Sequence, residues 1–322
     1  MMSFFHVAVL AIAALFATAT VSAQETPGGE KRVAITFDDV PRAPGPWLEE
    51  DDRTLLLLAN LERAGVDQAA FFLNPGRITQ REGAKDRIAA YVAAGHVIAN
   101  HTATHPRLSQ VGLEAYLADL DAAESWLRGQ DGYRPWFRYP YLDEGSRDKP
   151  KRDAMRAALA ERGLLNAYAT IDASDWFYEA AAKKAVAAGS PVDRDALRDL
   201  YVEAHVEAAE FYDGIARQAW GRSPVHVLLL HETDIAAMWI DDLVRALRAK
   251  GWTIVSADEA FADPIAADAA TYDTPFAQGT LTEQVAWQEG VPAPRWYRGN
   301  NTDLAQEWFD ARVLGRSANN AD

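Results

Sequence analysis

The arrangement of apolar segments is the feature that most limits what this chain can fold into. Seven short runs rich in β-branched, aromatic and other apolar residues alternate with segments of helical length. The runs are 33–37, 69–73, 96–100, 135–139, 165–170, 225–230 and 252–256. Several are apolar at consecutive positions, which is typical of parallel strands covered on both faces. Alternating strands and helices predict a parallel α/β sheet, either open or closed into a barrel.

Helical periodicity fills the intervals between these runs. Residues 52–64 and 112–128 show it clearly, and each stretch is followed by a glycine that favours helix termination. The interval 177–221, after the fifth run, is longer than the others and contains the helical stretch 193–219. We therefore predict a helical insertion at 177–221.

The two ends of the chain differ from this pattern. Residues 7–21 are apolar but too few for a comfortable membrane span, and small residues follow them, as at a signal-peptide cleavage site. We expect residues 1–23 to be a secretory signal, with a retained membrane anchor as the alternative. The mature protein is then secreted or periplasmic, without stable membrane insertion. It consists of a barrel over 24–264 and a C-terminal extension over 265–322 that wraps the barrel or extends away from it.

Composition excludes several classes of function. The 322 residues include no cysteine, so disulfides, thiolate metal sites and cysteine nucleophiles are impossible. Lysine and arginine number 32 against 47 acidic residues, for a net charge of −15. This charge repels phosphate backbones, so nucleic acid is not an expected partner. The sequence leaves the oligomeric state open.

Ionisable residues gather where the predicted strands end. In parallel α/β folds the loops at the carboxyl ends of the strands converge on the functional site. Five of the seven runs carry such residues at that end: Asp38 and Asp39, His101 and His105, Arg138 and Tyr141, Asp172 and Asp175, and His231. We therefore expect these side chains to face one rim of the sheet.

The pair His101 and His105 indicates a metal site. Their i,i+4 spacing predicts two imidazoles on one face of a helical turn that ends near Pro106. Two neutral imidazoles and one carboxylate form a three-ligand site with open positions, as a hydrolytic Zn²⁺ requires. Asp38 or Asp39 supplies the third ligand, which leaves the other carboxylate free to accept a proton. Nitrogen and oxygen ligands also accept Co²⁺ or Ni²⁺.

Five motifs in this order resemble the NodB-homology polysaccharide deacetylases of carbohydrate esterase family 4. They are TFDD at 36–39, HTATH at 101–105, RYPY at 138–141, DASDW at 172–176 and LLH at 229–231. The resemblance implies a distorted (β/α)7 barrel, with Asp38 as the catalytic base and with Asp39, His101 and His105 as ligands of one divalent ion. It also implies that Arg138 orients Asp38. We expect this arginine and the ion to lower the Asp38 pKa.

The resemblance assigns the remaining motif residues as well. The backbone N–H of Tyr141 would bind the oxyanion, and Trp176 would form an apolar wall of the acyl pocket. Asp175 would hold His231, the catalytic acid, and keep its imidazole charged near pH 7. The role of Asp172 stays open between a loop-forming residue and a functional one.

The implied activity is metal-dependent removal of acetyl groups from an N-acetylated amino-sugar polysaccharide or oligosaccharide. A carbohydrate is thus the expected partner. The alternatives are an O-acetyl esterase or non-sugar amide hydrolase with the same site, and a carbohydrate-binding protein without activity. Val40 stands where the family has glycine, and the insertion and the extension have no counterpart in the family pattern, which leaves the substrate open.

Three other histidines are not expected in the site. His96 opens its strand at the remote end, where a structural hydrogen bond is expected. His205 is predicted to lie on the solvated face of a helix. His226 has the opposite strand parity to His231 and should point away from the site.

Overall fold

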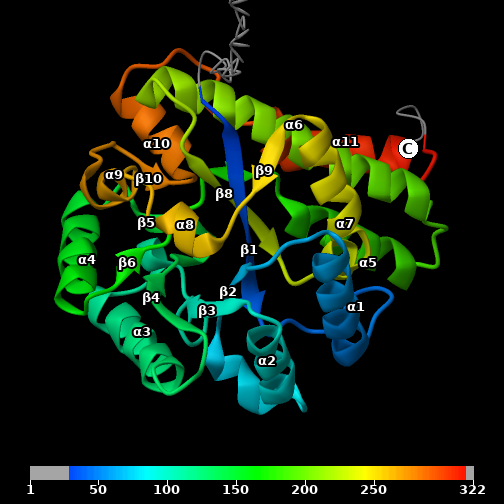
Figure 1. Cartoon of the computed structure of the whole chain (residues 1–322), viewed down its shortest axis with the longest axis horizontal. Coiled ribbons are helices and arrows are strands. Elements are labelled where there is room, and N and C mark those ends of the chain that lie inside the picture. Colours follow the sequence, from blue (N-terminus) through cyan, green and yellow to red (C-terminus); the bar gives the residue numbers. More distant parts are fainter. Residues whose placement is uncertain (1–28, 317–322) are drawn as a thin grey trace, which may run out of the picture.

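A curved sheet of parallel strands surrounded by helices forms the centre of the computed structural model, which describes residues 29–316 (Figure 1). The predicted signal, residues 1–23, lies outside the described residues. The sheet contains β1 (Lys31–Val40), β2 (Ala70–Leu73), β3 (Val97–Asn100), β4 (Tyr133–Phe137), β6 (Leu165–Asn166), β7 (Ile171–Asp172), β8 (Val225–His231) and β9 (Trp252–Ile254). Within residues 29–316, no helix has the length and apolar character needed to cross a membrane.

The strand order is β6-β4-β3-β2-β1-β8-β7, with β9 paired to the start of β1. The fifth predicted strand, 165–170, is wrong as a single element, because β6 pairs with β4 while β7 pairs with β8 at the other edge. Between them the backbone N–H of Ala167 donates to Phe137 and that of Thr170 donates to Val227. This one segment therefore links the two edges of the sheet, which gives the distorted barrel that was predicted.

Helices cover the outside of the sheet. They are α1 (Glu50–Arg63), α2 (Ala84–Ala93), α3 (Leu113–Leu127), α4 (Lys149–Glu161), α5 (Asp175–Ala187), α6 (Arg194–Trp220), α7 (Asp234–Ala249), α8 (Ala257–Phe261), α9 (Ala266–Thr271), α10 (Leu281–Gln288) and α11 (Thr302–Arg312). Short 3₁₀ turns are η1 (Pro75–Gln80), η2 (Leu108–Gln110), η3 (Pro140–Leu142) and η4 (Arg298–Asn300). The helices predicted from periodicity at 52–64, 112–128 and 193–219 correspond to α1, α3 and α6.

Local signals explain the bounds of α6, which occupies most of the interval 177–221. The Asp193 side chain accepts a hydrogen bond from the backbone N–H of Ala196 at the start of the helix, as an N-cap does. Gly221 follows the last turn with φ of 69°, a left-handed conformation that glycine adopts without steric cost. His205, in the middle of α6, is fully buried, so the prediction of a solvated position is wrong. This helix is covered on more than one side, because α7, α10 and α11 all pack against it.

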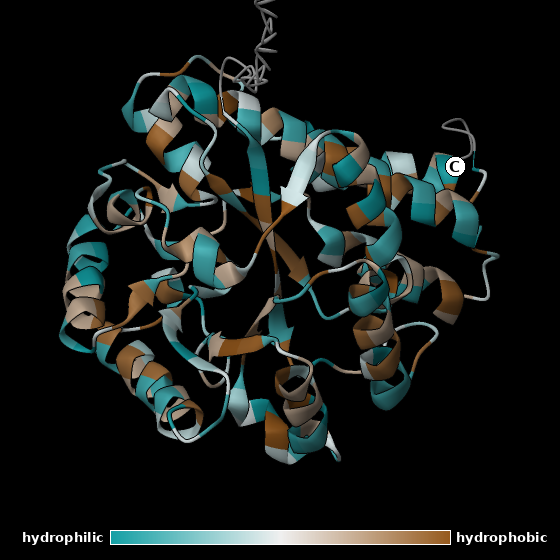
Figure 2. Cartoon of the chain, viewed as in Figure 1, coloured by the Kyte–Doolittle hydropathy of each residue, from teal (hydrophilic) through white to brown (hydrophobic). Residues whose placement is uncertain are grey.

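Alternation along the strands separates two hydrophobic layers. In β1, Val33, Ile35 and Phe37 belong to the layer beneath the outer helices, whereas Ala34 belongs to a second layer inside the barrel. Figure 2 shows the apolar character of the central strands and the polar character of the outward helix faces. Because side chains alternate with a period of two, Thr36 and Asp38 share the inner face with Ala34. The side chain of Asp38 therefore points into the barrel.

The described part of the C-terminal extension, residues 265–316, packs against the barrel. Its strand β10 (Ala277–Gln278) pairs antiparallel with β5 (Asp143–Ser146), which follows the fourth barrel strand. Helix α10 packs against α6, and α11 packs against α5 and α6. The extension thus reaches the same end of the sheet as the loops that carry the predicted motifs.

Candidate metal centre

The motif residues meet in a cleft of about 720 Å³ at the carboxyl ends of the strands. The cleft lining includes Asp38, Asp39, His101, His105, Tyr141, Asp172, Trp176 and His231. Arg138 and Asp175 are fully buried behind this surface and contact the lining residues from below. The structure therefore brings all the predicted site residues together, and it divides them into a lining and a supporting layer.

Three side chains form a candidate metal centre. One ligand atom each from Asp39, His101 and His105 lies within 4.8 Å of the other two. Asp39 Oδ1 is 3.0 Å from His105 Nε2 and 3.9 Å from His101 Nε2. No hydrogen bond to this buried oxygen is formed within residues 29–316, although Arg77 Nη1 lies 3.4 Å from it as an ion-pair partner. An orphaned carboxylate oxygen facing two imidazoles fits a divalent ion of the Zn²⁺, Co²⁺ or Ni²⁺ type.

The orientation and charge of His101 favour metal binding. Its Nδ1 lies 2.8 Å from the carbonyl oxygen of Arg138, so Nδ1 carries the proton and the Nε2 lone pair faces the cleft. Burial, with a contribution from His105, holds the His101 pKa well below its usual value, and the ring stays neutral. Burial raises the pKa of Asp39, but His105 and neighbouring positive groups outweigh burial and keep it well below its usual range. Both groups are thus in their ligating forms.

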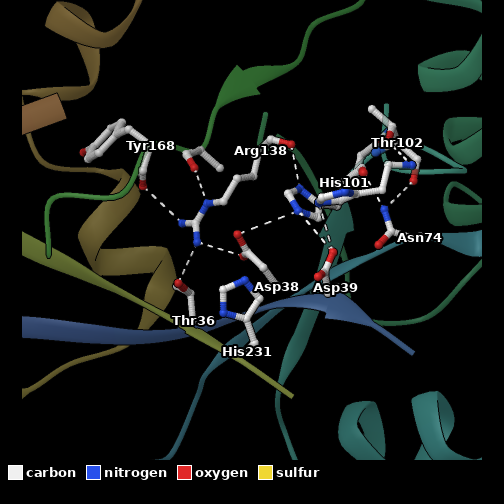
Figure 3. A network of polar contacts seen from close by, with 12 residues as sticks. Thr36, Asp38, Asp39, Asn74, His101, Thr102, Arg138, Tyr168 and His231 are labelled. Carbon is white, nitrogen blue, oxygen red and sulfur yellow. Dashed lines mark hydrogen bonds and ion pairs between the residues drawn. The ribbon is translucent and has the colours of Figure 1, made fainter. Parts of the chain in front are cut away.

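The backbone that carries the two histidines is not the predicted helical turn. Residues 101–105 form an irregular loop in which Thr102 and His105 have φ of 63° and 66°. The Asn74 side chain donates to the carbonyl oxygens of His101 and Thr102 at 2.6 and 3.0 Å, which holds the loop against β2 (Figure 3). The rings meet edge to face with centroids 4.9 Å apart. The left-handed conformations of Thr102 and His105 therefore bring the two imidazoles together, which a helical turn was expected to do.

A bulge in β1 aims both carboxylates at the same imidazole. The pairing register with β2 shifts between Phe37 and Val40, and Asp39 has φ of 69°. As a result His101 Nε2 lies 3.8 Å from Asp38 Oδ2 and 3.9 Å from Asp39 Oδ1. The two acids are adjacent in sequence and converge on one point in space.

Arg138 supports Asp38 from inside the barrel. Its Nη1 donates to Asp38 Oδ1 at 3.0 Å and to Thr36 Oγ1 at 2.8 Å (Figure 3). Its remaining nitrogens donate to the backbone carbonyls of Ala167 and Tyr168, in the segment that closes the barrel. Burial nevertheless raises the Asp38 pKa, and the guanidinium offsets this only in part. Arg138 thus lowers the Asp38 pKa, as expected, but burial outweighs its effect.

His231 and Asp175 form a second ionisable pair. His231 stands opposite Asp38 in the register between β8 and β1, so both side chains point to the inner face. Its Nδ1 is 2.6 Å from Asp175 Oδ1, and its backbone N–H donates to Asp175 Oδ2 at 2.7 Å. Burial alone lowers the His231 pKa, but the Asp175 carboxylate outweighs burial and raises it above the usual value. The raised pKa favours the charged form of this imidazole, which lines the cleft.

The other predicted residues are found where the sequence placed them. Tyr141 and Trp176 line the cleft with about half and two-fifths of their surface exposed. Asp172 accepts a hydrogen bond from the backbone N–H of Ser174, as a turn-forming residue does, and it also lines the cleft, so its role stays open between the two. His96 accepts a hydrogen bond from the backbone N–H of Ala69, and His226 is buried beside Asp213 on the far face, both as predicted.

Several residues of the cleft were not predicted from the sequence. Arg42 donates to Asp39 Oδ2 at 2.7 Å, and Arg77 donates to the Asp39 carbonyl oxygen at 3.2 Å. The C-terminal extension supplies another group, namely Phe276, Gln278, Gly279, Thr280, Glu283, Trp296 and Asn300. Arg42 follows the TFDD motif by three positions, and this closeness in sequence could have identified it as a cation near Asp39. The residues of the extension carry no periodic or motif signal.

The fold and the site together define a parallel α/β barrel with a candidate single-ion centre, beside which lie a carboxylate and a carboxylate-bound imidazole. Residues 25–162 match the family model of the polysaccharide deacetylases. The resemblance predicted from the motifs is thus confirmed.

Two similar proteins illustrate this relationship. Over 150 residues the chain is 31% identical to a peptidoglycan-N-acetylglucosamine deacetylase of Bacillus cereus, covering 47% of this chain and 48% of that protein. The chain thus aligns with about half the length of this curated relative. The structure of a chitin deacetylase from Colletotrichum lindemuthianum superposes with a TM-score of 0.50 and 20% identity, over 73% of this chain and 88% of that one. This likeness confirms the predicted fold class.

Proposed function

We propose that the protein is a metal-dependent hydrolase that removes acetyl groups from N-acetylated amino-sugar polysaccharides or oligosaccharides. One observation carries the proposal: the His–His–Asp candidate ligand set, a separate carboxylate and the carboxylate-bound imidazole of His231 all face one cleft. The name of the Bacillus cereus relative, which specifies N-acetylglucosamine in peptidoglycan, supports this substrate class. The apolar N-terminal segment supports action outside the cytoplasm.

Asp39, His101 and His105 would hold the ion. A divalent ion there supplies Lewis acidity, which lowers the pKa of a bound water molecule from about 15.7 toward about 7. Arg42 holds the outer oxygen of Asp39, so the inner oxygen alone faces the imidazoles. Asp39 Oδ1 is therefore the carboxylate oxygen that would bind the ion together with the two imidazoles.

Asp38 would accept the proton of the attacking water. Its Oδ1 is held by Arg138, whereas Oδ2 faces the candidate centre at 3.8 Å from His101 Nε2. Burial raises the Asp38 pKa, which makes this carboxylate a better proton acceptor than an exposed aspartate. The buried guanidinium also keeps the carboxylate in one orientation throughout the reaction.

His231 would protonate the leaving amine. An amine departs readily only when it is protonated, and the raised His231 pKa keeps a proton on this ring near neutral pH. Asp175 occupies Nδ1, so Nε2 is the nitrogen that can give its proton to the substrate. The backbone N–H of Tyr141 would donate to the oxyanion, and Trp176 would contact the acetyl methyl group.

An acetate-release screen tests the proposal. The full mature protein is incubated with chitin oligomers, peptidoglycan fragments and acetylated xylan, with and without chelator, followed by addition of Zn²⁺, Co²⁺ or Ni²⁺. We expect acetate from an N-acetylated substrate, its loss with chelator and its recovery with metal. Release from xylan alone would instead indicate an O-acetyl esterase. Sugar binding without any acetate release would indicate a non-catalytic binding protein.

A further inference from the structure

The C-terminal extension forms one wall of the cleft and is fastened to the motif-bearing loops. The backbone N–H of Gly279 donates to Leu142 at 3.1 Å, next to Tyr141, and β10 pairs with β5. At the other end of the wall Asn300 donates to the Asp172 carbonyl oxygen at 3.0 Å and accepts from Ser174 Oγ at 2.9 Å. These bonds fix the position of the wall relative to the candidate metal centre.

Exposed aromatic side chains concentrate on this cleft. Seven large hydrophobic side chains are exposed among the described residues, and four of them line the cleft: Tyr141, Trp176, Phe276 and Trp296. Two of the four belong to the C-terminal extension. An exposed ring that is rigidly placed packs well against the apolar C–H face of a sugar ring. The concentration therefore indicates a site for a saccharide longer than the acetylated unit alone.

Two arginines at the margin of the cleft lack an anionic partner. The Arg107 guanidinium lies over the Tyr141 ring at 4.2 Å, and the Arg147 guanidinium lies over the Phe276 ring at 5.6 Å. Neither guanidinium makes a hydrogen bond or ion pair with any residue in the range 29–316. This is unexpected in a chain with 47 acidic residues, where carboxylates engage most other arginines.

The two arginines belong to adjacent segments. In the turn after Arg107, the backbone N–H of Ser109 donates to Asp143 Oδ2 at 3.0 Å, and Asp143 opens the strand β5 that leads to Arg147. Phe276 immediately precedes the paired strand β10, in which Ala277 stands opposite Ser146. Both stacked guanidinium groups thus flank the same side of the cleft, with their donor edges free.

We propose that this margin is a subsite for a carboxylate-bearing sugar, in which Phe276 and Tyr141 contact the ring and Arg107 and Arg147 bind the carboxylate. Guanidinium groups present paired donors that match the two oxygens of a carboxylate. The net charge of −15 repels anions at long range, so a local pair of cations is what selects an acidic saccharide. The proposal rests on the proposed function and narrows its substrate to N-acetylated saccharides that carry a carboxylate.

The test compares acidic and neutral saccharides of equal length. A hyaluronan tetrasaccharide carries uronate carboxylates, a peptidoglycan tetrasaccharide freed of its stem peptides carries lactyl carboxylates, and chitotetraose is neutral. For the wild type we expect at least one acidic saccharide to exceed chitotetraose about tenfold in kcat/KM, in line with hydrogen bonds to charged groups. The double variant Arg107→Gln/Arg147→Gln should reduce this ratio to about one. Arg295→Gln, which removes a guanidinium stacked on Trp287 outside the cleft, should leave the ratio unchanged.

Binding measurements separate the subsite from the chemistry. Calorimetric titration of the full protein with the same three saccharides should show the acidic preference, reduced by salt and by the double variant. If no saccharide releases acetate but this preference persists, the proposed function fails and the subsite stands. If acetate is released with equal efficiency from acidic and neutral saccharides, or if the double variant keeps the preference, the subsite is overturned and the function stands.

Discussion

Asp175 binds His231 through both carboxylate oxygens, one at the ring Nδ1 and one at the backbone N–H, at 2.6 and 2.7 Å. The carboxylate is completely buried and the imidazole nearly so, so their attraction is weakly screened. The double contact fixes the tautomer and the direction of the ring at once. Any proton that His231 gives up must therefore leave from Nε2, toward the cleft.

Replacing Asp175 should move the alkaline limit of activity. The folded His231 pKa is raised, so the charged acid is present below that pKa and is lost as pH rises through it. In Asp175→Asn the charge is gone while burial remains, so the alkaline limb of the kcat profile should shift to lower pH. We also expect kcat at neutral pH to fall by about 10²- to 10⁴-fold. Kinetics across pH, with NMR titration of the His231 ring, measures both effects; an unshifted limb would contradict the role of the pair.

Replacing Asp38 should separate metal binding from catalysis. Asp38→Asn removes the proton acceptor but leaves Asp39, His101 and His105 in place, so metal content should persist while acetate release is lost. His101→Ala removes a ligand and should abolish both. Metal analysis of the purified variants beside kinetics measures this difference. Full activity in Asp38→Asn would refute its assignment as the base.

Arg138 and Asp38 should be strongly coupled in stability. Both are buried, and their nearest atoms are 3.0 Å apart. Arg138→Met leaves a buried carboxylate without its partner, which typically costs about 3–5 kcal/mol. Adding Asp38→Asn to this variant removes the uncompensated charge and should restore part of the loss. Denaturant unfolding of the two single variants and the double variant measures the coupling; additive losses would show that the pair is not coupled.

The sequence predicted those parts of the structure that depend on local pattern. The alternation of apolar runs with helical segments predicted the parallel sheet. The ionisable residues at the ends of the runs predicted that Asp38, His101 and His231 lie at one rim of that sheet. The residues of the run 165–170 do not indicate that it divides into β6 and β7. The division arises because β6 and β7 pair with strands at opposite edges of the sheet, and those strands are distant in the sequence. The left-handed conformations of Asp39 and His105 were equally hidden, since neither residue is glycine.

The sequence could not predict that the C-terminal extension forms a wall of the cleft, for a related reason. Phe276 and Trp296 lie about 45 residues or more beyond the last motif, in a segment whose turns and short helices show no clear period. Their place at the cleft depends on contacts between segments distant in the sequence, such as the pairing of β10 with β5 and the hydrogen bond between Gly279 and Leu142. His205 was predicted to face solvent because it is a polar residue in a long helix. Three other helices pack against that helix, and His205 is buried.

His96 should make the protein less stable in acid. It is 4% exposed, its Nδ1 accepts a hydrogen bond from the backbone N–H of Ala69, and burial lowers its pKa to about 4. The unfolded chain takes up a proton below about pH 6.5, whereas the folded protein resists protonation until about pH 4. The contribution of neutral His96 to the free energy of unfolding is thus fully present above about pH 6.5 and decreases as the pH falls. At pH 5 the loss should be about 2 kcal/mol.

A variant that keeps an acceptor but cannot titrate isolates this effect. Glu179 and Glu283, whose pKa values burial raises to about 7, act in the opposite direction, since they favour the folded state as pH falls. Both remain in His96→Gln, so their contribution cancels when the variant is compared with the wild type. Between pH 7 and pH 5 the variant should therefore lose about 2 kcal/mol less unfolding free energy than the wild type. Urea unfolding at the two pH values measures the difference, and equal losses would mean that His96 is protonated in the folded protein.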